Sequence, residues 1–210
     1  MRLPPRLEAV ATELVGIESF ADIGTDHGKL PVYALLNKIV KTAIATDISA
    51  PSLNKAILLS EKKGVLLDAR LGKGFEPLAV EEVSAIVIAG MGGNEIIDIL
   101  NSPKTFNKYI LVPHKHTVAL RKYLKQKNIG ITKDYVVRES GFYYHIITCS
   151  ILHKWNNSHS VYIGSDNEGR ADFAAYLTYR LNVLKTLIPK CGEKLEEFER
   201  ERKELEKWQQ

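Results

Sequence analysis

The chain has 210 residues, 45% of them hydrophobic, and a modest formal net charge of +4, which fits one medium domain or a slightly smaller domain with an appendage. No apolar run approaches the roughly 20 residues that cross a bilayer, and the two cysteines, Cys149 and Cys191, have neither metal-binding nor disulfide spacing. Membrane proteins and disulfide scaffolds are therefore disfavoured, and, because the first residues lack the apolar segment of a signal peptide, we expect a cytoplasmic protein without a metal ion.

Over residues 5–127 the predicted elements alternate between strands and helices. Residues 5–15 are predicted to form an amphipathic helix, because Leu7, Val10 and Leu14 fall on one face. Residues 84–89 are continuously apolar, as expected of a strand that is buried on both faces. Such alternation indicates a parallel sheet covered by helices. The other predicted strands cover residues 19–23, 42–46, 65–70 and 108–112, and the other predicted helices cover residues 29–40, 49–63, 94–100 and 117–127.

Two further predicted strands, at residues 131–139 and 142–152, are rich in Val, Ile, Tyr and Thr. Only Ser140-Gly141 separates them, which predicts an antiparallel hairpin. We therefore expect an α/β fold with a mostly parallel, seven-stranded sheet that ends in this hairpin.

From residue 167 onward the pattern is helical. Apolar residues spaced by three and four positions form a seam from Phe173 to Ile188, Pro189 and Gly192 interrupt it, and a similar seam resumes at Leu195. We predict a coiled-coil-like hairpin of two antiparallel helices. It would form a second domain over residues 161–210, after a first domain of residues 1–160. The alternative is that these helices merely cover the sheet.

A glycine-containing turn follows the first predicted strand, in the run Asp22-Ile-Gly24-Thr25-Asp26-His27-Gly28. Glycine permits a tight turn and a close approach of the backbone to a ligand, and the next helix offers free N–H groups. The dinucleotide fingerprint G-x-G-x-x-G fails, because Asp26 and Lys29 occupy its second and third glycine positions. A carboxylate at Asp26 would repel a pyrophosphate, which favours a zwitterionic ligand without phosphate, such as S-adenosylmethionine. The alternative is a turn in an unrelated α/β protein.

Three more loops follow predicted strands, where open α/β sheets bind ligands. Asp47 ends the second strand, where an acid can accept both hydroxyls of an adenosine ribose; its alternative role is to stabilise the next helix. The third loop contains Gly72 and Gly74, which suit a loop that lies flat against adenine. The fourth loop contains the small residues Ala89 and Gly90, which leave room for a sulfonium group and a substrate. The predicted cofactor-binding residues are Asp22, Gly24, Thr25, His27, Gly28, Asp47, Ile48, Gly72, Gly74, Ala89, Gly90 and Met91.

Positive charge is concentrated between residues 104 and 138, where Asp134 is the only acid. A basic segment on a mildly acidic body is the pattern expected of a phosphate-binding face. The alternative is a solvated helix that carries its lysines outward. The residues predicted to contact substrate RNA are Lys115, Arg121, Lys122 and Lys125.

The run Asp-Ile-Gly-Thr-Asp-His-Gly-x-Leu-Pro, with Ile-Ala-Gly-Met-Gly-Gly some sixty residues later, resembles the bacterial TrmK family of tRNA methyltransferases, which modify N1 of adenine 22. The resemblance extends from Arg6-Leu7 through the strand hairpin, and more loosely to the helical tail. It implies a class I Rossmann-like methyltransferase fold, S-adenosylmethionine as donor and a coiled-coil-like C-terminal domain that helps to hold tRNA. The chain departs from the family at two places. After the fifth predicted strand the family usually has Gln-Pro-Asn, whereas this chain has Val112-Pro113-His114. In the glycine loop the family often has Asp, whereas this chain has Lys73.

The residues also bear on which atom is methylated. Methylation of an exocyclic adenine amine typically uses an Asn- or Asp-Pro-Pro-aromatic loop after the fourth strand, and Ala89-Gly90-Met91 stands there instead. Carbon-5 methylation of pyrimidines needs a cysteine nucleophile, and Cys149 and Cys191 are poorly placed for that. A ring nitrogen such as N1 of adenine has an in-plane lone pair and needs positioning more than activation.

Asp26 is the predicted catalytic residue, because a carboxylate near the base would stabilise its developing positive charge. The alternative for Asp26 is a turn or helix-capping residue. Two other functions stay open: a methyltransferase acting on another RNA or a small molecule, and a non-catalytic RNA- or nucleotide-binding module.

Overall fold

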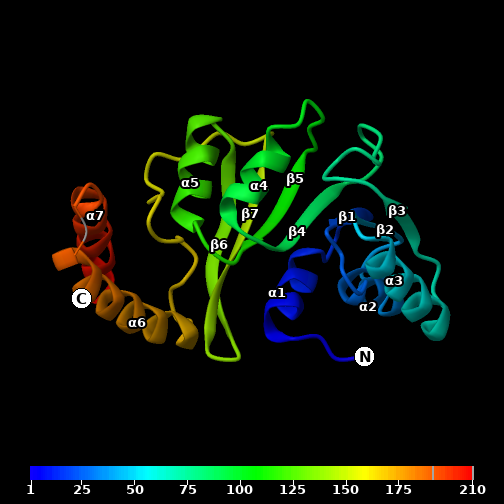
Figure 1. The fold of residues 1–210 in the computed structure, drawn as a ribbon, viewed down its shortest axis with the longest axis horizontal. Coiled ribbons are helices and arrows are strands. Elements are labelled where there is room, and N and C mark those ends of the chain that lie inside the picture. The colour runs from blue at the N-terminus through cyan, green and yellow to red at the C-terminus, as the bar shows by residue number, and fades with distance from the viewer. Residues whose placement is uncertain (191, 210) are drawn as a thin grey trace.

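Seven strands form one sheet in the computed structural model, which describes residues 1–190 and 192–209 (Figure 1). The strand order is β3-β2-β1-β4-β5-β7-β6, with β1 to β5 parallel and β7 antiparallel to both its neighbours. This confirms the predicted mostly parallel sheet and its terminal hairpin. Cys191, one of the two cysteines considered as a nucleophile, lies outside the described residues. The strands are β1 (Ser19–Ile23), β2 (Thr42–Asp47), β3 (Asp68–Leu71), β4 (Ala85–Met91), β5 (Lys108–Pro113), β6 (Gly130–Glu139) and β7 (Phe142–Ser150).

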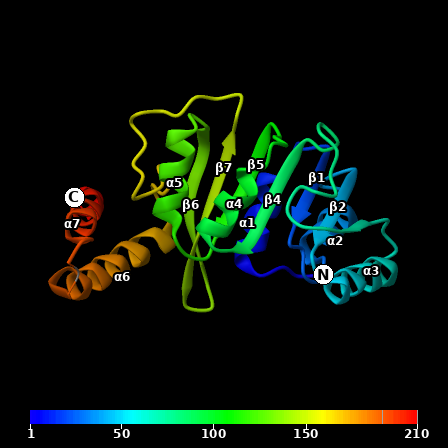
Figure 2. The same ribbon diagram turned by 45° about the horizontal axis from the view of Figure 1, so that its top comes forward.

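Helices cover both faces of the sheet (Figure 2). Alternate residues of β4 point to opposite sides: Ile86 and Ile88 belong to one apolar core, and Val87 belongs to the other. Helices α4 and α5 pack on the first core, and α1 and α2 pack on the second, with α3 beside α2. These helices are α1 (Pro5–Glu13), α2 (Lys29–Leu36), α3 (Ala50–Lys63), α4 (Gly93–Leu100) and α5 (Thr117–Gln126).

Two predicted boundaries are wrong for local reasons. The second helix ends at Leu36 rather than residue 40, because Lys38 adopts a left-handed conformation with φ 55° and Ile39 donates its N–H to the Ala34 carbonyl. Strand β3 begins at Asp68 rather than residue 65, because the Val65 N–H closes the preceding helix on the Ser60 carbonyl.

The C-terminal part forms the predicted pair of antiparallel helices, α6 (Ala171–Leu187) and α7 (Leu195–Glu206), with short 3-10 turns at Ile188–Lys190 and Lys207–Gln209. The Phe173 ring, near the start of α6, contacts the Trp208 ring beyond α7, with centroids 5.1 Å apart. The pair also packs on the sheet, because Val136 of β6 shares a small apolar core with Phe173 and Leu184.

Strand β6 lies at the edge of the sheet, and the segment between β7 and α6 runs along it (Figure 2). The backbone N–H groups of Asp134, Val136 and Arg138 donate to side-chain oxygens of Asp166, Asn167 and Asp172, each at 2.9 Å. Polar side chains therefore take the place of a further strand at this edge. Within the described residues, no helix is long and apolar enough to cross a membrane.

Candidate active site

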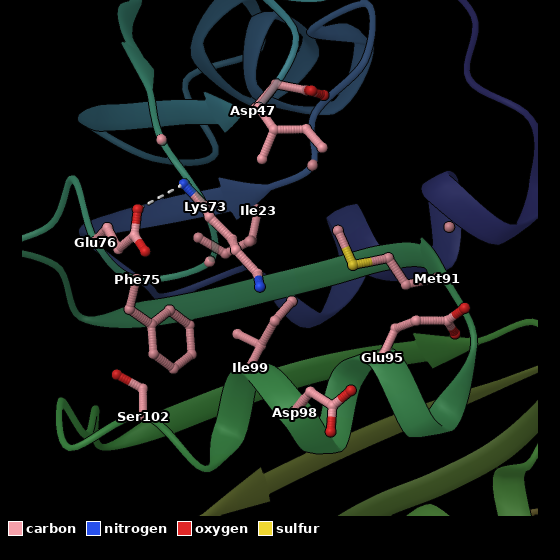
Figure 3. A pocket seen from close by; sticks show the side chains of 15 residues that line it. Ile23, Asp47, Lys73, Phe75, Glu76, Met91, Glu95, Asp98, Ile99 and Ser102 are labelled. Atoms are coloured by element: carbon pink, nitrogen blue, oxygen red, sulfur yellow. Dashed lines mark hydrogen bonds between the residues drawn. The ribbon is translucent and has the colours of Figure 1, made fainter.

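A cavity of about 660 Å³ opens at the carboxyl ends of the parallel strands (Figure 3). Its size is within the usual range for small-molecule sites. Helix α4 closes one side with Glu95, Asp98 and Ile99, and the Lys73 side chain reaches across it. All four predicted loops contribute to its lining, through Gly24, Asp47, Ile48, Gly72, Gly74, Gly90 and Met91.

The loop after β1 is held tightly against the neighbouring strands. The N–H groups of Gly24 and Thr25 both donate to the Thr46 carbonyl, at 2.8 and 2.9 Å. Gly24 has a φ of 72°, and a Cβ there would collide with the methyl group of Met91. Gly90 has a φ of 101°, a conformation that side chains disfavour. The two glycines therefore let two strand ends approach each other at the floor of the cavity.

Asp47 is fixed at the end of β2 by two backbone donors. Its Oδ2 accepts the N–H of Asp26 at 3.1 Å, and its Oδ1 accepts the N–H of Ser49 at 2.9 Å. Each oxygen keeps a lone pair free, and the side chain lines the cavity. An oriented carboxylate of this kind suits a pair of ribose hydroxyls.

Asp22 is a buried carboxylate, with an exposed fraction of 5%. The Thr25 hydroxyl donates to its Oδ2 at 2.7 Å. Burial, with a smaller effect of the Asp47 charge, raises the pKa of Asp22 to about 6. A buried acid without a cation beside it is a suitable partner for the ammonium group of a ligand.

A second hollow of about 380 Å³ meets the cavity at Gly24 and Gly90, which line both. Asp26 lies in this hollow with a φ of 52°, and its Oδ2 contacts Nδ1 of His27. Gly28, not Asp26, precedes the first turn of α2, and no side chain caps that helix. The capping alternative for Asp26 is therefore wrong. Also in this hollow are Asp22, Thr25 and Ala89 of the predicted set, together with Arg6 and His114.

Gly28 borders neither hollow. A Cβ at Gly28 would lie 2.6 Å from the Cβ of Ala56, so its glycine is needed where α2 packs against α3. Arg6 and His114 were not predicted as site residues, because they come from α1 and from the end of β5, far from the glycine loops in the sequence. In the sequence, His114 is marked by its departure from the family and by the His-x-His pair that it forms with His116, which suggested contact with RNA as one alternative.

A family model described as "Methyltransferase domain" matches residues 3–147. The chain belongs to this methyltransferase family. It is 34% identical over 153 residues to the tRNA (adenine(22)-N(1))-methyltransferase of Bacillus subtilis, an alignment that covers 70% of this chain and 64% of that protein. The chain thus spans just under two thirds of the length of this curated relative.

Solved structures agree with this membership in the methyltransferase family. Mycoplasma capricolum TrmK, solved with S-adenosyl-homocysteine, superposes with a TM-score of 0.86 at 25% identity, over 99% of this chain and 98% of that one. The TrmK structure from B. subtilis gives a TM-score of 0.69 at 25% identity, over 98% and 95%. The resemblance to the TrmK family and the class I Rossmann-like fold are thereby confirmed.

The predicted RNA-contacting residues fall into two groups in the structure. Lys115, Lys122 and Lys125 are exposed, although Lys115 lies 4.0 Å from Glu95 and Lys122 pairs with Glu197 of α7. Arg121 is completely buried, so the prediction that it contacts RNA is wrong.

The Arg121 guanidinium instead binds both carboxylate oxygens of Asp134, at 2.7 and 2.8 Å, and donates to Nδ1 of His145 at 3.0 Å. Burial and the Arg121 charge keep the pKa of His145 well below its usual value, so its ring is neutral and can accept this bond. This buried group joins α5 to the hairpin strands.

Proposed function

We propose that the protein transfers a methyl group from S-adenosylmethionine to N1 of an adenine in tRNA, at the position that corresponds to adenine 22, and that it does so in the cytoplasm. The observation that carries the proposal is the pair of hollows that meet at Gly24 and Gly90. One hollow contains Asp47, a carboxylate suited to ribose hydroxyls, and the other contains Asp26. The name of the B. subtilis relative supplies the substrate, and the M. capricolum structure, which holds S-adenosyl-homocysteine, supplies the cofactor.

The residues present fit the donor. Asp47 would accept the ribose hydroxyls, Ile48 and the Gly72–Gly74 loop would border the adenine, and Asp22 would face the ammonium group. Lys73 can donate a hydrogen bond but cannot accept one, so it would meet a ring nitrogen of that adenine rather than its amine. The buried Asp22 carboxylate, which no cation in the described residues neutralises, supports this orientation.

When bound, S-adenosylmethionine supplies a sulfonium methyl group, whose S–C bond breaks with its electron pair on sulfur as the N1 lone pair of the base forms a C–N bond. The base gains positive charge in this step. The chain's own contribution would be to hold N1 in line at the Gly24–Gly90 junction and to face the charge with Asp26. No proton needs to leave the base for the transfer to occur.

The test of this function is incubation of a bulk tRNA pool with the protein and S-adenosylmethionine, followed by mass spectrometry of the nucleosides. We expect 1-methyladenosine to rise, and Asp47→Ala to weaken donor binding and reduce the rise. Methyl groups in a different nucleoside, or none in tRNA, would contradict the proposal.

Donor binding is expected to depend on pH through Asp22. Its pKa is raised to about 6, so below pH 6 the carboxyl is protonated and must lose its proton before it can pair with an ammonium group. Donor affinity should therefore rise about tenfold per pH unit up to about pH 6 and level off above it. Calorimetry from pH 4.5 to 8 measures this.

The matched variants for this pH dependence are Asp22→Asn and Glu61→Gln. Asparagine at position 22 should bind the donor more weakly and without the pH slope, while Glu61→Gln, on the exposed surface of α3, should keep it. A slope that survives in Asp22→Asn would assign the titration to another group.

tRNA binding is expected to depend on Lys115, Lys122 and Lys125. Replacing all three with Gln should lower the slope of log affinity against log salt by up to about 0.7–0.9 for each phosphate that is no longer neutralised, and affinity near physiological salt should fall accordingly. Lys55, Lys62 and Lys63 lie on α3 at the other end of the sheet (Figure 1), and their Gln variant is the control. Equal slopes in both triple variants would place the RNA face elsewhere.

A further inference from the structure

His114 lies where the two hollows meet. It follows the last residue of β5, and its backbone N–H donates to the Met91 carbonyl at 2.9 Å, which fixes the position of the residue beside β4. Its Nε2 is 3.9 Å from the point that a Cβ on Gly90 would occupy. The ring therefore stands over the backbone at the junction, on the side of the Asp26 hollow.

The His114 ring packs against Tyr144, and Arg6 lies over the same Tyr144 ring. The Tyr144 ring meets the His114 ring edge-on, with centroids 5.4 Å apart, and the Arg6 guanidinium lies 5.1 Å from the centre of the Tyr144 ring. The contact with Tyr144 does not use the nitrogens of the imidazole. His114 is an exposed residue that lines the Asp26 hollow, and within the described chain neither of its ring nitrogens has a protein hydrogen-bond partner.

The charges around His114 favour the neutral ring. Partial burial and the nearby Arg6 lower its pKa, against a smaller opposite effect of Glu139 and Glu95. A neutral imidazole has one nitrogen that accepts a hydrogen bond. Asp26 faces the same hollow, but its Oδ2 already contacts His27.

We propose that His114 accepts a hydrogen bond from the exocyclic N6 amine of the target adenine and thereby positions N1 at the Gly24–Gly90 junction. This rests on the proposed function. N6 and N1 are neighbours on the Watson–Crick edge of adenine, so a contact to the amine also fixes where the adjacent ring nitrogen lies. His114 is in this sense a specificity residue, which selects a base that carries an amino group beside an unprotonated ring nitrogen.

The test pairs a change in the enzyme with a change in the base. His114→Phe keeps a ring against Tyr144 but removes both nitrogens, and a tRNA with purine riboside at the target position keeps N1 but lacks the N6 amine. Single-turnover methylation rates are measured for both enzymes on both tRNAs. Dissociation constants of both tRNAs are measured on protein saturated with S-adenosylhomocysteine, which gives a readout that needs no turnover.

We expect His114→Phe to slow methylation of the adenine tRNA by about ten- to a hundredfold and that of the purine tRNA by less than about threefold, in line with the removal of one specific hydrogen bond. Removal of the amine should weaken tRNA binding to the wild-type protein and have little effect on the variant. His114→Asn, whose amide can still accept from the amine, should recover most of the discrimination. His116→Asn is the matched control, because this neighbouring histidine is exposed like His114 but lines neither hollow, and the variant should behave as wild type.

An equal loss of rate on both tRNAs with His114→Phe would overturn the assignment and give His114 a role in shaping the site only. The same conclusion would follow if Asp26→Asn, rather than the His114 variants, removed the sensitivity to the amine. Failure of the wild-type protein to methylate the adenine tRNA would overturn the proposed function, and this assignment with it.

Discussion

Replacing Asp26 with asparagine is expected to lower the turnover number of tRNA methylation by about ten- to a thousand-fold, where each factor of ten corresponds to on the order of 1.4 kcal/mol of barrier. In the proposed reaction the positive charge appears on the base only as the methyl group transfers, so the carboxylate would act mainly in the transition state. Dissociation constants for donor and tRNA should change much less.

The local structure makes this substitution a clean test of charge. Asp26 has a left-handed backbone, with a φ of 52°, and asparagine is among the few residues that adopt this conformation readily. Its backbone N–H, rather than its side chain, supports Asp47, and the side chain caps no helix. Asparagine therefore keeps the turn, its shape and its bond to Asp47, and removes the charge that faces the hollow and His27.

Single-turnover rates and calorimetry separate the two effects on this variant. Near-normal turnover would reduce Asp26 to a turn residue, and the stabilising charge would have to come from another group or be unnecessary. A parallel loss of rate and of donor affinity would indicate instead that the loop has moved and carried Asp47 with it.

Replacing Arg121 with methionine is expected to lower the free energy of unfolding by about 3–5 kcal/mol, because it leaves the buried carboxylate of Asp134 without its partner. Asp134 is 2% exposed, so water cannot replace the guanidinium without opening the packing between α5 and β6. Chemical denaturation measures the change.

Two comparisons interpret the Arg121→Met result. Lys122→Met removes the neighbouring exposed ion pair with Glu197 and should cost no more than about 1 kcal/mol. The double variant Arg121→Met/Asp134→Leu removes both buried charges and should recover much of the lost stability. A small effect of Arg121→Met alone would mean that water reaches Asp134 in the folded protein.

The sequence was sufficient for the sheet and for the loops that line the cavity, because both follow local patterns. Buried parallel strands appear as short apolar runs, and a ligand at their carboxyl ends calls for small residues directly after them, as at Gly24 and Gly90. The four loops needed no knowledge of distant contacts beyond the strand alternation itself.

The residues of the Asp26 hollow were harder to predict from the sequence, because they come together only in the folded structure. Arg6 carries no local signature, and it meets His114 and Asp26 only once α1 packs against β6 and β7. Arg121 was misassigned because a run of basic residues does not reveal which one faces inward. Its position between the buried Leu120 and Leu124, with one acid in the same segment, was the available sign that it lies on the apolar face of its helix.

The polar cover on β6 has a consequence for how the chain is made. A nascent chain that has reached only residue 160, the boundary predicted between the two domains, would present three outward-facing N–H groups of β6, those of residues 134, 136 and 138, to any strand of another molecule. Intermolecular strand pairing would compete with folding until Asp166, Asn167 and Asp172 emerge and occupy them. A shortened chain should therefore extend to about residue 172, at the first turn of α6, if the β6 edge is to stay covered.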